Sequence, residues 1–346
     1  MGEILGIGTT HYPPGLVPEE HRPWPLARML HTDPRIPEAM RDPANWPEPM
    51  RAEWGSDEGI SAFREHRDRV FGGFRTLRDE IAAFRPDLIV MWGDDQYENF
   101  QEDVIPPFCV LAYDQLEFQP FKRLGRRPNI WGEPADKTFT WPGHRAAGRY
   151  LVTQLLRAGI DVSYAYRPLH GDGVAHAFAN TLLYLDLDRQ GFPYPVLPVT
   201  VNCYGRDVIR NRGGGSQHAI EEDPPAPSPR RCFELGQATA RIFRDSPWRV
   251  VLMASSSWSH AFLTEKNHFI YPDLAADRVL LEQLGAGDYA AWRDLSLEQM
   301  EASGQHEVLN WVCLAGAMAE LGAKMQLVDW VETWIFNAPK CQAIFR

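Results

Sequence analysis

Short apolar segments, three of them preceded by a helical pattern, are the feature that most constrains what this chain can fold into. Mainly apolar residues make up 4–8, 88–92, 162–166, 196–201 and 250–254, and helical patterns at 61–84, 144–158 and 232–243 come before three of them. Segments this short and continuously apolar are typical of strands buried on both faces. The sequence therefore predicts an α/β fold with a central mixed, mostly parallel sheet that helices cover on both faces.

The organisation of the 346 residues indicates one folding unit. We find no internal repeat and no linker, and we expect a single-domain sandwich over residues 1–346. The segment from about 12 to 60 stands apart, because it holds ten prolines together with Trp24, Trp46 and Trp54 and shows no regular pattern. An irregular segment of this length is usually a functional lid or a disordered insertion. Its tryptophans favour an ordered lid that packs on the body.

Charge and cysteine content narrow the possible partners and the compartment. Thirty-five Lys and Arg against 46 Asp and Glu give a net charge of −11, which repels phosphate backbones and argues against nucleic acid as a partner. No apolar run approaches the roughly 18 residues that cross a bilayer. The five cysteines form no CxxC pair, as expected for buried thiols in a reducing cytoplasm. They are Cys109, Cys203, Cys232, Cys313 and Cys341.

Polar clusters follow four of the predicted strands. They are His11, the run Asp94-Asp95-Gln96, His170 and the pair Ser259-His260. Sites in sheets of this kind lie beyond the carboxyl ends of the strands, so we expect these side chains to converge. Convergent histidines and carboxylates suit divalent-metal binding or general acid–base catalysis.

Several other reaction classes lack their sequence motifs. The chain has no P-loop, no G-x-G-x-x-G after its first strand, no G-x-S-x-G elbow and no HExxH helix. We therefore expect neither a nucleotide cofactor nor a serine-hydrolase or HExxH zinc-protease mechanism.

The ordered series of segments resembles the class III extradiol ring-cleavage dioxygenases, typified by the catalytic β subunit of protocatechuate 4,5-dioxygenase. The resemblance covers most of the chain and rests on the series rather than on any single piece. In order, the segments are His11 followed by proline, Asp95-Gln96, Pro106-Pro107-Phe108, His170-Gly171, Arg231-Cys232-Phe233, Ser259-His260 and Glu307 at the start of a helix.

The resemblance implies a mononuclear Fe(II) enzyme that cleaves the ring of a small catechol-like or aminophenol-like compound with O₂. Two histidines and one glutamate hold the metal in that family, and they correspond to His11, position 96 and Glu307. The family's general base corresponds to His260. The histidine of its Asp-His-Gly motif corresponds to His170, although Leu169 stands in place of the aspartate.

Position 96 is the main departure, because Gln96 stands where the family has its second ligand histidine. One interpretation is that an oxygen donor from this loop completes the site: Gln96 itself, Asp94, Asp95, or Glu98, which would face the same side as Gln96 if the strand continued. A second is that the site prefers a harder divalent metal than Fe(II). A third is a degenerate site, with the fold kept for a binding or partner role.

Structural roles are the alternatives for the other residues. Glu307 could cap its helix, and His260 could be a core histidine that bonds to the preceding serines. Six further histidines are expected at the surface or in support of the site; they are His66, His144, His176, His218, His268 and His306. Family members associate with themselves or with small subunits, so the resemblance implies a homo-oligomer or a complex with a small partner subunit.

Overall fold

The computed structural model describes residues 2–21, 24–170, 173–205 and 224–346. The strands in these ranges are β1 Ile4–Thr9, β2 Leu88–Asp94, β3 Phe108–Leu111, β4 Gln115–Phe118, β5 Phe139–Pro142, β6 Ser163–Ala165, β7 Val196–Val201, β8 Val250–Ser255, β9 Met325–Val331 and β10 Lys340–Phe345. The α-helices are α1 Trp24–Thr32, α2 Glu48–Trp54, α3 Ile60–Phe84, α4 Arg145–Arg157, α5 His176–Leu185, α6 Pro229–Arg244, α7 Leu274–Ala286, α8 Tyr289–Arg293, α9 Leu297–Ala302 and α10 Val308–Leu321.

Eight of these strands form one central sheet in the order β6-β3-β7-β2-β8-β1-β10-β9, while β4 and β5 form a separate hairpin. Strands β7, β2, β8 and β1 run parallel to one another at its centre. Strand β3 runs antiparallel to β7, and β10 runs antiparallel to β1. The predicted mixed, mostly parallel sheet is therefore confirmed.

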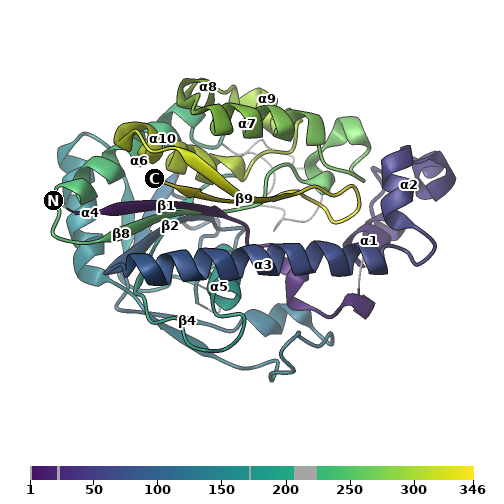
Figure 1. The fold of residues 1–346 in the computed structure, drawn as a ribbon, viewed down its shortest axis with the longest axis horizontal. Helices are drawn as coiled ribbons and strands as arrows, with labels where there is room; N and C mark the ends of the chain where they lie inside the picture. The colour runs from purple at the N-terminus through teal and green to yellow at the C-terminus, as the bar shows by residue number, and fades with distance from the viewer. Residues whose placement is uncertain (1, 22–23, 171–172, 206–223) are drawn as a thin grey trace.

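Helices cover both faces of the sheet, as predicted (Figure 1). Helix α3 runs along one face with α5, and α4, α6 and α10 lie on the other. Alternate residues of the central strands enter two separate cores: Leu88 and Val90 pack on the α10 side, and Ile89 and Met91 pack on the α3 side. Burial of both faces explains why these strands are apolar at consecutive positions.

Close packing between β1 and α10 depends on a glycine. A Cβ at Gly8 would lie 2.1 Å from the ring of Trp311, so the indole rests directly on the strand backbone. Trp311 is buried and donates its indole N–H to the Ser256 carbonyl at 3.0 Å. The same contact brings the first turn of α10 close to the ends of β1 and β8.

The segment 12–60 is more regular than its prolines suggest, and the prediction of an irregular segment is wrong. It contains α1, α2 and several short 3₁₀ helices, because proline is well tolerated in the first turn of a helix. Trp46 is buried and packs edge-on against Trp54 with ring centroids 5.3 Å apart, as expected of an ordered segment. The side chain of Trp24 lies outside the described residues.

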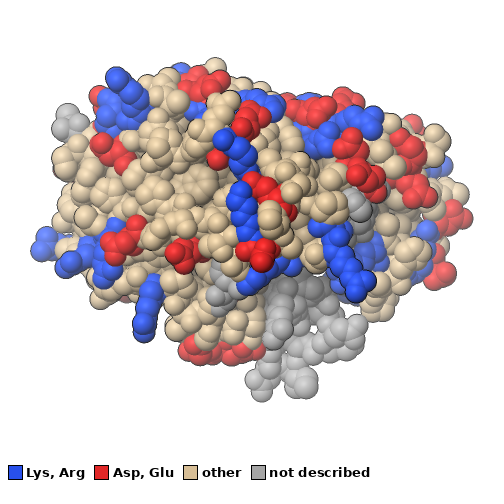
Figure 2. Space-filling view, turned by 90° about the horizontal axis from the view of Figure 1, so that it is seen from below, with Lys and Arg blue, Asp and Glu red and all other residues tan. Residues whose placement is uncertain are grey.

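Charges of both signs lie side by side on the face of the molecule that Figure 2 shows. Ion pairs of the described residues include Arg69–Asp329 and Arg75–Asp188. All five cysteines are free and buried. None of the described helices combines the length and apolar character that crossing a bilayer requires.

The packing of Gly8 against Trp311 leads to a stability prediction. Gly8→Ala should lower the free energy of unfolding by about 1–3 kcal/mol, because the added methyl group forces the indole or the strand to shift. Denaturant unfolding followed by circular dichroism measures the change. Gly72→Ala is the matched control: its Cβ would meet no atom within 4 Å on α3, and we expect a neutral effect or a gain of up to about 1 kcal/mol. An equal loss in both variants would contradict this account.

Candidate active site

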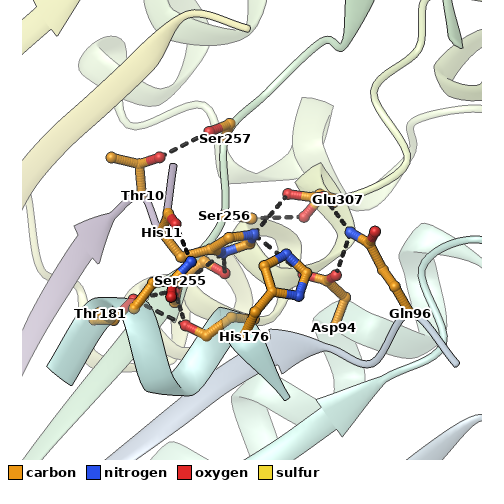
Figure 3. Close-up of polar contacts among 12 residues, drawn as sticks. Thr10, His11, Asp94, Gln96, His176, Thr181, Ser255, Ser256, Ser257 and Glu307 are labelled. Atoms are coloured by element: carbon orange, nitrogen blue, oxygen red, sulfur yellow. Dashed lines mark hydrogen bonds and ion pairs between the residues drawn. The ribbon is translucent and has the colours of Figure 1, made fainter. Parts of the chain in front are cut away.

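Three neighbouring parallel strands deliver the candidate site. Strands β1, β8 and β2 lie side by side, with Thr9 paired to Ser255 and Trp92 paired to Ala254. Their carboxyl ends therefore meet at one edge of the sheet. His11 follows β1, the segment 256–260 follows β8, and Asp94 ends β2 (Figure 3).

His11 and His260 each present an unprotonated Nε2 to the site. The Nδ1 atom of His11 lies 3.1 Å from the Ser255 carbonyl, and that of His260 lies 2.8 Å from the Trp258 carbonyl. A carbonyl oxygen only accepts, so Nδ1 carries the proton in both rings. Burial lowers the pKa of His11 to about 4 and that of His260 to about 3, so both rings are neutral at pH 7.

Glu307 lies between these two rings. It precedes α10 and makes no side-chain capping hydrogen bond, so its carboxylate is not used to cap that helix. Its Oε2 lies 3.6 Å from Nε2 of His11, and its Oε1 lies 3.4 Å from Nε2 of His260. Glu307 is only 1% exposed, and burial, with the nearby charge of Asp94, raises the pKa of its carboxyl well above the usual value.

Gln96 and Tyr204 hold the carboxylates in place. The Gln96 amide donates from Nε2 to Asp94 Oδ2 at 2.9 Å, to Tyr204 Oη at 2.6 Å and to Glu307 Oε1 at 3.1 Å. The Tyr204 hydroxyl in turn donates to Glu307 Oε1. Gln96 therefore lies at the site, as the resemblance implies for position 96, but its nitrogen rather than its oxygen faces the carboxylates.

His176 is the site residue that sequence reasoning missed. It begins α5, and its ring lies edge-on to the ring of His11, with centroids 4.8 Å apart. Its Nδ1 lies 3.0 Å from Glu98, and burial lowers its pKa to about 4. The available signal was a histidine directly before the apolar run 177–179, which packs α5 against the sheet.

Glu98 supports His176, and the premise that it follows Gln96 on a continuing strand is wrong. Strand β2 ends at Asp94, and Tyr97 has a positive φ of 64°. The Asp95 carboxylate accepts the backbone N–H groups of residues 98, 99 and 100, which folds the chain into a turn. Glu98 then accepts the His176 backbone N–H and pairs with Arg123.

His170 is placed apart from this cluster in the described contacts. Its Nε2 lies 2.9 Å from Asp103, and its backbone N–H donates to Asn99. We expected the strand before His170 to run parallel to the central strands and so to place His170 at the site, and this premise is wrong. Strand β6 is the edge strand and, being parallel to β3, runs opposite to the four central strands.

The other histidines have mixed positions. His66 is buried against Tyr12 and Phe336 and does not lie at the surface. His306 stacks on Tyr204 beside the site, with ring centroids 5.8 Å apart. His144 caps α4, His268 is exposed, and His218 lies outside the described residues.

The donor set fits a divalent cation. His11, Asp94 and His176 bring one ligand atom each to within 4.8 Å of one another, and Glu307 adjoins them. Asp94 Oδ1 and Glu307 Oε2 are buried and make no hydrogen bond with the described residues. Buried carboxylate oxygens are costly unless a cation or a donor compensates them, so the site suits a positive ion.

A cavity of about 270 Å³ opens beside the cluster. Gln96, His176 and Asn180 contribute polar groups to its wall, and Arg123 and Arg127 contribute positive charge. The remaining wall is largely apolar, with Pro13, Pro14, Leu16, Val17, Phe118, Leu124 and Val174. The volume suits a small ring compound.

A second buried network supports the loop that carries His260. Asp277 on α7 accepts hydrogen bonds from the backbone N–H and the hydroxyl of Ser259, and from Gln305 at 2.7 Å. Burial raises the pKa of Asp277 from 3.8 to about 7, and these hydrogen bonds oppose that rise only partly. The folded protein therefore holds this proton more tightly than the unfolded chain does.

This proton gives a pH-dependent prediction. As the pH rises from about 4 to about 7, Asp277 loses a proton that the folded state retains better, so its contribution to stability declines. Asp277→Asn removes this term. Relative to wild type, the variant should gain on the order of 2 kcal/mol of unfolding free energy between pH 5 and pH 7.5. Urea unfolding at both pH values checks this, and a constant difference between the two proteins would contradict it.

Comparison with known proteins gives the same picture as the site. Residues 219–337 match the family described as the catalytic LigB subunit of aromatic ring-opening dioxygenase. A 2,3-dihydroxyphenylpropionate/2,3-dihydroxicinnamic acid 1,2-dioxygenase of Pseudomonas putida is 31% identical over 195 residues, which span 56% of this chain and 49% of that protein.

Longer matches have lower identity. An enzyme of the same name from Paraburkholderia phymatum is 25% identical over 308 residues, and one from Cupriavidus necator is 24% identical over 304 residues. Each match covers 75% of this chain and 85% of the relative. The solved structure of an uncharacterized protein, JW3007 from Escherichia coli K12, has a TM-score of 0.49 at 12% identity, covering 80% of this chain and 91% of that one.

The family match includes His260 and Glu307, and the longer relatives extend the similarity over most of the chain. Together with the mixed α/β sheet, these findings show that the chain is similar to the aromatic ring-opening dioxygenases over most of its length.

Proposed function

We propose that this protein is an Fe(II)-dependent extradiol dioxygenase that opens the ring of a small catechol-like compound with O₂. The observation that carries the proposal is the convergence of His11, Glu307 and His260 on one buried point beside a cavity. His11 and Glu307 are proposed metal ligands. When bound, the ferrous ion would orient both reactants and supply the one-electron chemistry that O₂ requires.

His260 is the proposed general base. Its Nε2 is unprotonated because Nδ1–H donates to the Trp258 carbonyl, so Nε2 can accept the proton of a substrate hydroxyl. The Ser259–Asp277 network fixes the loop that carries His260. The ring is thus held in one tautomer and one orientation before the substrate arrives.

The resemblance makes His170 a second catalytic residue beside His260, and we propose that His176 has that role instead. It lines the cavity, and Glu98 holds its Nδ1 proton and so directs Nε2 toward the other site residues. We propose that Nε2 hydrogen-bonds a substrate oxygen and exchanges a proton with it. The Asn180 amide on α5 donates to the His11 carbonyl at 3.1 Å. This hydrogen bond ties the backbone of His11 to the helix that carries His176.

The cavity wall indicates the substrate class. Leu16, Val17 and Phe118 offer apolar contacts to a ring, whereas Arg127 carries a positive charge at the same cavity. The named substrates of the relatives are catechols that bear an acidic side chain. We therefore propose a catechol with a carboxylate substituent, and we expect it to be preferred over a neutral alkyl catechol.

Assembly and domain organisation belong to the same proposal. The whole chain would act as one catalytic domain, in which 12–60 serves as a lid, since Pro13, Pro14, Leu16 and Val17 line the cavity. We propose self-association or a small partner subunit. Strand β9 is an edge of the central sheet with Leu327 44% exposed, which offers a surface for contact. Light scattering measures the assembly.

The activity is tested by O₂ uptake. Anaerobically iron-loaded protein should consume O₂ with acidic catechols and yield a yellow ring-opened product. His260→Ala should lower kcat by about 10²–10⁴-fold while iron content stays unchanged, because His260 acts on the proton and not on the metal. Iron-loaded wild type that consumes no O₂ across a broad catechol panel would contradict the proposal and favour a binding or partner role.

A paired substitution tests the assignment of His176. His176→Gln should lower kcat/KM by at least about tenfold, because a neutral amide cannot exchange the proton. His170→Gln should change kcat/KM by less than about threefold, since that ring faces Asp103. Steady-state O₂ uptake measures both. The reverse ranking of the two variants would return the role to His170.

A further inference from the structure

We propose that Asp94 is the metal ligand that replaces the family's histidine at position 96, and that Gln96 is a positioning residue that orients Asp94 and Glu307. This inference rests on the proposed function, since it concerns the same metal. It makes the site one of a single ligand histidine and two carboxylates.

Two unpartnered oxygens carry the inference. Asp94 Oδ1 and Glu307 Oε2 are buried and have no hydrogen bond with the described residues, although the two side chains are 0% and 1% exposed. Both atoms face the same nitrogen: Nε2 of His11 lies 4.0 Å from Asp94 Oδ1 and 3.6 Å from Glu307 Oε2 (Figure 3). Two donors bonded to one ion at about 2.1 Å lie at most about 4.2 Å apart, so both separations are compatible with a shared ion.

Gln96 occupies the other oxygen of each carboxylate. Its Nε2 donates to Asp94 Oδ2 and to Glu307 Oε1, and the Tyr204 hydroxyl also donates to Glu307 Oε1. The opposite amide orientation would place a carbonyl oxygen against two carboxylate oxygens, which is electrostatically unfavourable. The nitrogen therefore faces the carboxylates, and an amide nitrogen that donates hydrogen bonds does not ligate a metal.

The two oxygens of each carboxylate therefore have different roles. One oxygen is held by the Gln96–Tyr204 pair, and the other is left for the ion. Glu98, the alternative donor from this loop, is engaged by His176 and Arg123, and Asp95 is engaged by the backbone of the turn. Asp94 is thus the carboxylate of the loop whose free oxygen faces His11.

Donor chemistry gives the expected metal preference. Two carboxylates and one neutral imidazole carry a charge of −2, which balances a divalent ion. Oxygen-rich sets favour harder ions, so the site should hold Mn(II) as well as Fe(II). His176, whose ligand atom lies within 4.8 Å of those of His11 and Asp94, remains on the cavity side.

Anaerobic titration of the metal-free full chain with Mn(II), followed by electron paramagnetic resonance of the free ion, tests the assignment. Asp94→Asn should raise the Kd by at least about thirtyfold, because a charged ligand becomes a weak amide donor. Gln96→Ala should raise it by about tenfold, as for the loss of a group that orients a ligand, and should alter the spectrum of bound Mn(II). Asp103→Asn is the control, because this carboxylate pairs with His170 outside the cluster; we expect the wild-type spectrum and a Kd within about threefold of wild type.

Thermal melting supplies an independent readout. Metal-free Asp94→Asn should melt above metal-free wild type, because one uncompensated buried carboxylate is removed, and Mn(II) should no longer raise its melting temperature. An Asp94→Asn variant that binds Mn(II) within threefold of wild type would overturn the inference. So would a Gln96→Ala variant with unchanged affinity and spectrum.

The same measurements separate this inference from the proposed function. Suppose that wild type binds Mn(II), that Asp94→Asn does not, and that iron-loaded wild type consumes no O₂ with catechols. This outcome would contradict only the dioxygenase proposal. If the iron-loaded enzyme is active and Asp94→Asn leaves its metal affinity unchanged, only the ligand assignment is contradicted. Wild type that binds neither Mn(II) nor Fe(II) would overturn both.

Discussion

The candidate site depends on the parallel alignment of β1, β8 and β2. Because these strands are neighbours in one sheet and run in the same direction, their carboxyl ends lie together. They bring His11, the segment 256–260 and Asp94 to one end of the sheet. Helix α10 then lies against the same strands, with Trp311 on the backbone of Gly8, and so places Glu307 opposite His11. Residues almost three hundred positions apart meet without any loop having to span the molecule.

The electrostatics of this edge are unfavourable without a ligand. Asp94 and Glu307 are buried close together, their neighbouring imidazoles are neutral, and two of their oxygens have no hydrogen bond with the described residues. A protein tolerates such a cost where function requires it, because binding of a cation recovers the lost free energy. The hydrogen bonds around the edge serve mainly to direct lone pairs. Backbone carbonyls fix His11 and His260, and the Gln96–Tyr204 pair fixes Glu307.

The limits of sequence reasoning lie in the loops. Strand β2 was predicted with its polar end, but the turn after Asp94 depends on a carboxylate that accepts three backbone N–H groups, and this contact reverses the expected direction of Glu98. His176 was only grouped with the histidines expected at the surface or in support of the site, because a lone histidine beside an apolar run has no distinctive pattern. The position of His176 at the site becomes evident only when α5 packs on the sheet and brings the His176 ring to His11. His170 had the more suggestive neighbours but follows an edge strand of opposite direction.

Local patterns by themselves determined the α/β class, the helices on both faces, the buried thiols and the polar strand ends, since each follows from the periodicity and hydrophobicity of neighbouring residues. The resemblance to the extradiol dioxygenases, and no local pattern, identified Gln96 as the residue that stands in place of a ligand histidine. Only the tertiary structure showed which side chain could act as a ligand in place of that histidine. The direction of a carboxylate or an amide depends on partners that are distant in the chain, and those partners become neighbours only when the strands pair and the helices pack.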